Sequence, residues 1–158
     1  MRRLIYIFLM LVVGCFLATG IVACSNDNCM GNSNGIPLAA FYEGNNAVTL
    51  PSLTVYGIDA PNDSAIIRNS SASQVYLPLR ITATTCEYVL DYNGTEIDND
   101  TLTLNYDIIP YFESRECGAM YNFDIKSWEF TCHAIDSVAI PDTRITNADV
   151  VTIKIFMQ

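Results

Sequence analysis

Hydrophobic and polar residues alternate along much of the chain after residue 36, which is the pattern of half-buried β-strands. In residues 101–108, leucine, tyrosine and isoleucine alternate with threonine, asparagine and aspartate. Because successive side chains of a strand point to opposite faces, we expect Leu104 to be fully buried at the centre of this run. The same alternation marks residues 86–92 and 75–83. Pro78 falls on the outward face of the second run, which predicts a sheet edge or a bulge.

Further strands are predicted at residues 38–43, 53–58, 120–132, 134–140 and 150–157. In residues 120–132 the hydrophobic positions are odd-numbered up to Ile125 and even-numbered from Trp128 onward. A β-bulge near Lys126 and Ser127 would keep both sets on one face. These short strands number about eight. No segment of the mature chain shows the 3.6-residue spacing of hydrophobic positions that indicates a helix. The sequence therefore predicts an all-β domain, an antiparallel β-sandwich of the Ig-like or transthyretin-like kind.

The N-terminus carries the pattern of an export signal. Arg2 and Arg3 precede an apolar stretch of residues 4–23, and Ile21-Val22-Ala23-Cys24 resembles the lipobox of bacterial lipoproteins. That resemblance implies that residues 1–23 are a signal peptide and that the Cys24 thiol carries lipid. Cys15 also fits the motif, but cleavage there would leave an apolar tail on the mature chain. An uncleaved signal anchor is the alternative, since about 20 apolar residues can span a bilayer.

Residues 24–35 are rich in asparagine, serine and glycine, which predicts a lipidated flexible tether before a single domain at residues 36–158. The expected location is the cell envelope, with the lipid in the outer membrane. Ser25-Asn26-Asp27 carries only one acid, a poor match to an acidic surface-export signal, so the periplasmic and surface faces both stay open.

Charge narrows the choice of partners. The formal net charge is −9, and it becomes more negative once Arg2 and Arg3 are removed. An acidic surface disfavours nucleic acid. The partners that stay open are the membrane, through the N-terminal lipid, and an unidentified protein or glycan.

The cysteines predict an oxidising compartment. Of six cysteines, Cys29, Cys86, Cys117 and Cys132 remain after Cys15 and Cys24 are assigned to the signal peptide and the lipid. Four thiols in an exported chain suggest two disulfides with three connectivities, and four free thiols are the alternative. With one histidine and no C-x-x-C pair, we expect neither a metal site nor a cofactor.

Local clusters give no strong sign of catalysis. The acidic residues 91–100 resemble a calcium loop in part, but Asn93-Gly94 between two alternating runs favours a type I′ hairpin turn. On one strand, His133 and Asp136 would point to opposite faces, which argues against a triad with Ser137. Most tyrosines lie at inward positions. Trp128 and Tyr111 are the expected ligand-facing aromatics, and we expect no enzyme activity.

Several short pieces together resemble an uncharacterised family of short Bacteroidota lipoproteins, a domain of unknown function. The pieces are Phe41-Tyr42-Glu43, Ile109-Pro110-Tyr111-Phe112, Glu116-Cys117-Gly118, Ile135-Asp136-Ser137, Ile145-Thr146-Asn147 and Ile153-Lys154-Ile155-Phe156. The resemblance implies a disulfide between Cys29 and Cys117. By elimination it leaves a pair between Cys86 and Cys132, which both fall on predicted inward faces. Asp63-Ser64-Ala65 is also similar to the O-glycosylation signal of that phylum, with Ser64 as the acceptor.

Three functions are compatible with this sequence. The first is a non-catalytic lipoprotein that acts as a binding or envelope-assembly module. The second is a small hydrolase or a carbohydrate-binding accessory protein, which a cleft with converging carboxylates, or with Trp128 beside Tyr111, would favour. The third is a pilin-like surface subunit, which would need a long, uncharged, unpaired edge strand.

Overall fold

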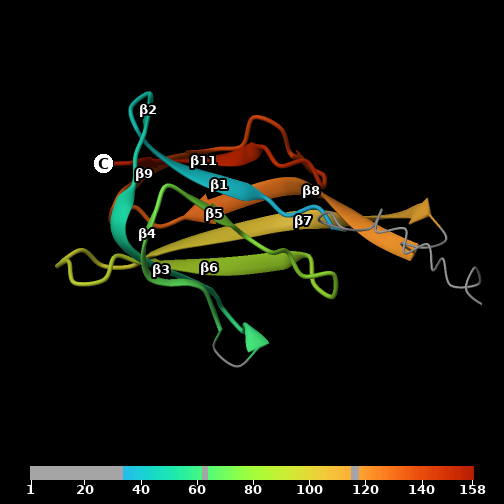
Figure 1. Ribbon diagram of the computed structural model, residues 1–158, viewed down its shortest axis with the longest axis horizontal. Coiled ribbons are helices and arrows are strands. Elements are labelled where there is room, and N and C mark those ends of the chain that lie inside the picture. The colour runs from blue at the N-terminus through green and yellow to red at the C-terminus, as the bar shows by residue number, and fades with distance from the viewer. Residues whose placement is uncertain (1–33, 62–63, 115–117) are drawn as a thin grey trace, which may run out of the picture.

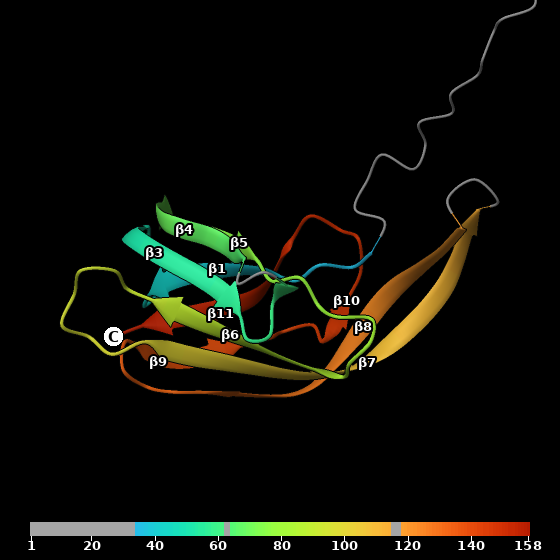
Figure 2. The same cartoon turned by 90° about the horizontal axis from the view of Figure 1, so that it is seen from below.

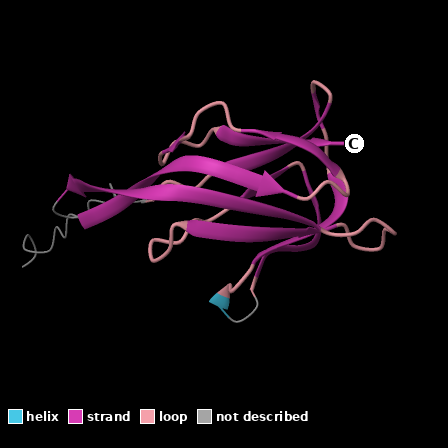
Figure 3. Cartoon of the chain, turned by 180° about the vertical axis from the view of Figure 1, so that it is seen from behind, coloured by secondary structure: helices cyan, strands magenta, loops and turns pink. Residues whose placement is uncertain are grey.

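The computed structural model describes residues 34–61, 64–114 and 118–158, with Glu113 and Ser114 described by their backbone alone. Within these ranges the chain is almost entirely strand and loop (Figures 1 and 3). The strands are β1 (Leu38–Glu43), β2 (Asn46–Ala47), β3 (Leu50–Gly57), β4 (Ala65–Ala72), β5 (Gln74–Tyr76), β6 (Thr85–Asp91), β7 (Asp100–Ser114), β8 (Gly118–Phe130), β9 (Ile135–Ala139), β10 (Arg144–Ile145) and β11 (Val151–Met157). The predicted signal peptide and three predicted site residues, Cys24, Cys29 and Cys117, lie outside the described residues.

The strands form two sheets. The first has the order β2-β1-β11-β9, with β5 also paired to β1, and the second has the order β10-β8-β7-β6-β3-β4. Every neighbouring pair is antiparallel except β1 with β11, which is parallel. Eight of these strands have five residues or more. The predicted antiparallel β-sandwich is therefore confirmed as a fold class, with eleven strands in the described residues instead of about eight and with one parallel pair.

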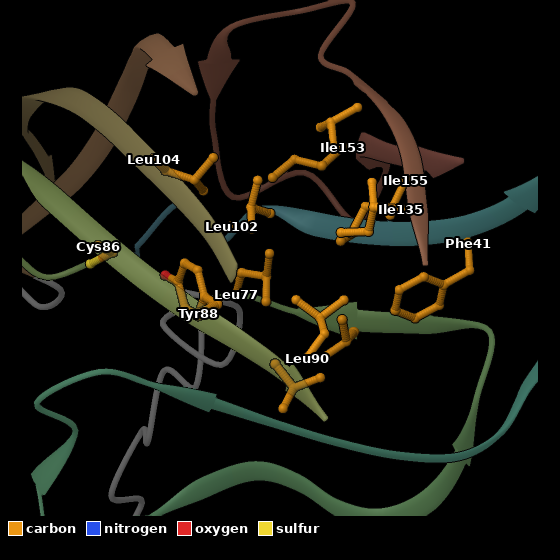
Figure 4. Close-up of a cluster of buried hydrophobic side chains, with 14 of the residues drawn as sticks. Phe41, Leu77, Cys86, Tyr88, Leu90, Leu102, Leu104, Ile135, Ile153 and Ile155 are labelled. Atoms are coloured by element: carbon orange, nitrogen blue, oxygen red, sulfur yellow. The ribbon is translucent and has the colours of Figure 1, made fainter. Parts of the chain in front are cut away.

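The hydrophobic core lies between the two sheets (Figure 4). Phe41, Ile135 and Ile155 come from the first sheet, and Leu90 and Leu104 come from the second. Leu104 has no exposed surface, as its position in the alternating run predicts. Burial of such side chains contributes about 1.5–3 kcal/mol each to folding, which is why the alternation determines which face of each strand turns inward.

The predicted bulge in β8 is present at Lys126. Asn105 of β7 is opposite Ser127, whereas the next residue, Tyr106, is opposite Ile125, so Lys126 is the extra residue. The bulge lets Ile125 be buried and Trp128 pack against the same core although their positions differ in parity.

The structure differs from the predicted strands in several places, of which β5 and β4 are the most informative. The predicted strand at residues 75–83 is limited to β5, because the chain leaves the sheet after Leu77 and Pro78 has no N–H to donate. Strand β4 was not predicted, because its residues are half-buried or exposed along most of its length and show no clean alternation.

The predicted hairpin after β6 also differs in its turn. The Thr95 N–H donates to the Tyr92 carbonyl (3.2 Å), and Gly94 has φ +76° while Asn93 does not have a positive φ. This is a type II turn inside a longer connection, not the predicted type I′ turn.

Asp100, the first residue of β7, is a fully buried carboxylate that joins β7 to the segment between β8 and β9. Oδ1 accepts hydrogen bonds from the Thr131 hydroxyl and the His133 N–H, both 2.8 Å. Oδ2 accepts from the Tyr92 hydroxyl (2.9 Å), the Ala134 N–H (2.8 Å) and the Ile135 N–H (3.0 Å). Burial by itself raises the pKa of the Asp100 carboxyl, but these hydrogen bonds outweigh it and hold the pKa below its ordinary value.

Strands β7 and β8 continue past the rest of the sandwich as a two-stranded arm, defined here as residues 109–114 and 118–121 (Figure 2). Strand β6 pairs with β7 only from Asp100 to Asn105, so the outer part of β7 has β8 as its only strand partner among the described residues. The described chain begins at the root of this arm. The Gly35 N–H donates to the Tyr121 carbonyl (2.8 Å), and the Tyr121 N–H donates to Asn34 Oδ1 (3.0 Å).

Gly35 is buried at this entry point, although it lies in the predicted tether. A Cβ at residue 35 would lie 2.7 Å from the Ile145 carbonyl oxygen, so only glycine fits without a shift of the backbone. The path of the chain is therefore determined where it reaches the arm.

Candidate functional site

Two adjoining hollows lie around the connection between β3 and β4. One is a pocket of about 280 Å³, and the other is a groove of about 590 Å³. Gly57, Ile58, Asp59 and Ala65 line both, so this connection forms the ridge between them. We call them the apolar pocket and the polar groove.

The apolar pocket lies between the β3–β4 connection and the segment that follows β5. Ile58, Ile66 and Leu79 are among the apolar side chains that line it, together with Cys86 and Tyr88 of β6. Arg80 and Glu87 also line it, the first exposed and the second half-buried. This combination suits a small apolar group inside the pocket, with a charged group near the surface.

Two tyrosine hydroxyls hold one wall of the apolar pocket in place. The Tyr88 hydroxyl donates to the Pro78 carbonyl (2.8 Å), and the Tyr106 hydroxyl donates to the Arg80 carbonyl (2.9 Å). The Arg80 N–H donates back to the Tyr106 oxygen (3.0 Å). Burial, with a smaller effect of the neighbouring Cys86, raises the pKa of both tyrosines, so they stay protonated and can donate. The wall therefore keeps its shape without being part of a strand.

The polar groove crosses the outward face of β3, β4 and β6. Tyr56, Arg68, Asp91 and Asn93 line it. Thr54 Oγ1 accepts hydrogen bonds from the Asn69 N–H and from Asn93 Nδ2, both at 2.8 Å. These bonds hold the floor of the groove, which Tyr56, Arg68 and Asp91 line with an aromatic ring, a cation and a carboxylate.

The backbone around the groove has an unusual conformation. Asp59 (φ 59°) and Asn69 (φ 42°) are the two non-glycine residues with positive φ among those that the structure describes, and both line the groove. Aspartate and asparagine tolerate this conformation better than most residues, but it is still uncommon outside glycine. Such positions gather at functional sites, where the surrounding structure holds them in place.

Sequence reasoning missed this site. Its residues come from three separate segments, and β4, which supplies Arg68 and Asn69, showed no strand pattern. The only local signal was the cluster of Gly57, Asp59 and Pro61, which reads as an ordinary turn.

The predicted disulfide between Cys86 and Cys132 is wrong. Both cysteines are free, with Cys86 buried and Cys132 exposed. Cys86 is opposite Leu104, and Leu104 is opposite Trp128, so Cys132, two residues past the end of β8, lies four residues beyond the level of Cys86. That offset is about 13 Å along the strand, whereas a disulfide needs Cα atoms within about 7 Å. The Cys86 Sγ instead lies 3.2 Å from the Tyr106 hydroxyl.

The two aromatics that we expected to face a ligand do not lie together. Trp128 is opposite Leu104 and Tyr111 is opposite Met120, which separates them by about 23 Å along the hairpin. Trp128 packs against the core, and its Nε1–H donates to the Val138 carbonyl (3.2 Å). The Tyr111 hydroxyl contacts Met120 Sδ at 3.5 Å.

One predicted site residue remains within the described ranges. Ser64 is exposed at the rim of the apolar pocket, next to the undescribed residues 62–63. The His133 backbone N–H donates to Asp100, and the Ser137 hydroxyl donates to Asp136 (3.1 Å). The described residues contain no group of three metal-ligating side chains. They also contain no helix long and apolar enough to cross a membrane.

The fold and the two hollows define a β-sandwich protein with a two-part surface site. The chain belongs to DUF6452, a family of unknown function, whose model matches residues 52–157. The match runs from the third residue of β3 to the last residue of β11 and leaves out β1 and β2, although β1 pairs with β11. No curated protein and no solved structure matches the chain. The predicted resemblance to an uncharacterised domain is confirmed at this level.

Proposed function

We propose that this protein is a lipid-anchored, non-catalytic binding module of the Bacteroidota cell envelope, with its lipid in the outer membrane. The observation that carries the proposal is the pair of adjoining hollows, one apolar and one polar, on either side of a shared ridge. Such a pair suits a ligand that places an apolar group in the pocket and hydrogen-bonding groups in the groove.

The anchor rests on the lipobox that ends at Cys24. We propose that the chain after Cys24 leads to the arm, where Asn34 and Gly35 contact Tyr121. The proposed Cys29–Cys117 disulfide would tie the tether to the same arm. The short sequence distances support this disulfide, because Cys29 is five residues from Asn34 and Cys117 is four residues from Tyr121, its contact on the arm.

Affinity capture of the lipidated protein from native membranes tests the site. We compare the wild-type chain with Leu79→Glu, which places a charge in the apolar pocket, and Arg68→Glu, which reverses a charge in the groove. Arg144→Glu is the matched control, because Arg144 is exposed and lies in β10, away from both hollows.

The expected result is a set of partners that the wild type and Arg144→Glu retain and that the two site variants lose. Retention of the same partners by all four chains would refute the hollows as the binding site. A Cys24→Ser chain should be released from the membrane or left unprocessed. Cleavage after Ala23 and lipid labelling of that variant would refute the anchor.

A carbohydrate-binding accessory protein is the second candidate, because Tyr56, Arg68 and Asp91 in the groove are the residue types that stack on and hydrogen-bond to sugars. Soluble envelope glycans should then compete with the captured partners. Loss of binding in Tyr56→Ala but not in Leu79→Glu would favour this function over the two-part site.

The pilin-like function has less support. The outer part of β7 has an open edge among the described residues, but Pro110 removes one of its N–H donors and the charged residue Glu113 follows. Strand β4 is an edge strand, but it carries Arg68 and its pairing with β3 is irregular at several positions. Strand β9, one edge of the other sheet, has five residues and carries Asp136. Charges and irregular pairing are what natural edge strands use to avoid adding another strand.

A further inference from the structure

We infer that Asn93 is a site of spontaneous deamidation, a reaction that turns its side-chain amide into a carboxylate and changes the polar groove. The chain contains two Asn-Gly pairs, Asn34-Gly35 and Asn93-Gly94. Such pairs are the sequences most prone to this reaction, because glycine has no side chain to hinder its backbone nitrogen and its backbone adopts many conformations. The structure distinguishes the two pairs, since it protects the first and leaves the second open to reaction.

The reaction needs only water as a co-reactant. The Gly94 backbone nitrogen attacks the side-chain carbonyl carbon of Asn93, and a new N–C bond forms. The bond from that carbon to Nδ2 breaks, and ammonia leaves with the proton of the Gly94 N–H. Water then opens the cyclic imide. Addition of water at the former side-chain carbonyl gives aspartate, and addition at the backbone carbonyl gives isoaspartate.

The backbone at Gly94 is free to move. Gly94 lies in the exposed connection between β6 and β7, and a Cβ at this residue would meet nothing within 4 Å. Its N–H donates no backbone hydrogen bond within the described part of the chain. A single bond from the Thr95 N–H to the Tyr92 carbonyl (3.2 Å) closes the turn. The Gly94 nitrogen can therefore approach Asn93 once this turn opens.

Asn34-Gly35 lacks this freedom. Gly35 is buried, and its N–H donates to the Tyr121 carbonyl (2.8 Å). Asn34 Oδ1 accepts from the Tyr121 N–H (3.0 Å). A Cβ at residue 35 would lie 2.7 Å from the Ile145 carbonyl oxygen, so the backbone is closely packed on that side as well. Strand β8 thus holds both groups that would have to react, which makes this pair an internal control.

Two hydrogen bonds hold the Asn93 side chain in the groove and slow the reaction. Nδ2 donates to Thr54 Oγ1 (2.8 Å) and to the Asp91 carbonyl (3.2 Å). The amide must release both acceptors before its carbon can meet the Gly94 nitrogen. The folded chain should therefore react more slowly than the unfolded chain. Because Thr54 accepts the shorter bond, loss of its hydroxyl should accelerate the reaction at Asn93.

Deamidation changes both the hydrogen bonding and the charge of the groove. A carboxylate only accepts hydrogen bonds, so the Asp91 carbonyl loses its donor from Asn93. The new negative charge joins those of Asp59 and Asp91, which line the same groove. Isoaspartate also lengthens the main chain by one carbon just after β6. We expect the modified groove to bind its partner more weakly, an effect that rests on the proposed function.

The test follows both Asn-Gly pairs in one sample of the full lipidated chain in detergent. The protein is incubated at mildly alkaline pH in heavy-oxygen water, then digested and mapped by mass spectrometry. Incorporated heavy oxygen identifies deamidation that took place before digestion. The same incubation in urea gives the unfolded reference. Thr54→Val, which keeps the size of the side chain, removes the hydrogen bond, and its Trp128 emission shows whether the variant is folded.

We expect Asn93 to deamidate severalfold faster than Asn34 in the folded chain and at nearly the same rate in urea. Folded Thr54→Val should deamidate at Asn93 faster than the wild type. Equal rates at Asn93 and Asn34 in the folded chain, or an Asn93 that stays intact there, would overturn the inference. The same difference between the two pairs in urea would also overturn it, because the fold would then have no part in the selection.

Asn93→Asp tests the effect on binding in the affinity capture described above. This variant should lose partners that the wild type retains. If it retains partners that Arg68→Glu loses, the effect of deamidation on binding is overturned while the groove stays the binding site. If both variants retain every partner, the groove fails as the binding site, and the mass measurement still decides whether Asn93 is modified.

Discussion

Replacing Asp100 by asparagine should destabilise the protein far more than its small change in size suggests. The carboxylate is fully buried and accepts five hydrogen bonds, three of them from the backbone N–H groups of His133, Ala134 and Ile135. An asparagine side chain has one carbonyl oxygen and one amide nitrogen, and the nitrogen cannot accept from an N–H. Whichever way the amide turns, at least one backbone N–H loses its acceptor.

The expected loss of stability in Asp100→Asn follows from these hydrogen bonds. If the amide nitrogen takes the place of Oδ1, the Thr131 hydroxyl can rotate to accept, but the His133 N–H is left unsatisfied. If it takes the place of Oδ2, two backbone N–H groups are left. A buried unsatisfied donor costs about 1–3 kcal/mol, and the remaining bonds lose the contribution of the charge. We therefore expect Asp100→Asn to lower the free energy of unfolding by about 3–5 kcal/mol.

Urea unfolding followed by Trp128 fluorescence measures this loss, because Trp128 is hydrogen-bonded to β9 and should report the loss of that contact. Asp107→Asn is the matched control, since Asp107 is on the same strand and forms only an exposed ion pair with Lys126 (3.2 Å). That change should cost less than about 1 kcal/mol. A cost for Asp100→Asn as small as that of the control would show that these bonds do not stabilise the fold.

The pH dependence gives an independent check. The folded-state pKa of Asp100 is lowered, so its contribution to stability is fully present above the ordinary aspartate pKa of about 3.9. The contribution is lost as the pH falls through the lower, folded-state pKa. The stability difference between wild type and Asp100→Asn should therefore be constant between about pH 5 and 8 and should shrink below about pH 4. A difference that grows on acidification would contradict the lowered pKa.

Three further predictions concern the core, the bulge and the thiols. Leu104→Ala should lower the free energy of unfolding by about 2–5 kcal/mol, and Thr103→Ala, on the opposite face, by much less; similar costs would mean that the face assignment is wrong. Deletion of Lys126 should turn Trp128 outward and destabilise the fold in urea unfolding, whereas Lys126→Ala, which keeps the bulge, should cost less than about 1 kcal/mol; equal effects would argue against the bulge. Under native conditions Cys132 should be alkylated quickly and Cys86 slowly, and a recovered Cys86–Cys132 disulfide peptide would contradict the structure.

Alternation of hydrophobic positions identified most of the sandwich because each strand turns one face to the core. It located β1, β6 and the bulge at Lys126, since the change of parity in β8 has only one explanation that keeps Ile125 and Trp128 together. It failed for β4, because an edge strand with little buried surface has no reason to alternate.

The groove and Asp100 could not be predicted for a different reason. Asp100 follows Asp98 and Asn99 and looks like a surface residue, yet four of its five donors lie 31–35 residues away in the sequence. The groove likewise joins residues of β3, β4 and β6. No local sequence pattern indicates contacts of this kind, because they depend on how the fold brings distant strands together.

The parallel pairing of β1 with β11 has a consequence for the order of folding. The Leu38 N–H donates to Thr152 Oγ1 across 114 residues of sequence, whereas β6, β7 and β8 are joined by successive hairpins. Long loops close slowly and local hairpins form quickly. As the chain is synthesised from N-terminus to C-terminus, the meander of β6, β7 and β8 can form before β11 is available to pair with β1. A chain that lacks β11 would leave β1 with an unpaired edge and β9 without its strand partner, which makes the last strand the step that completes the sandwich.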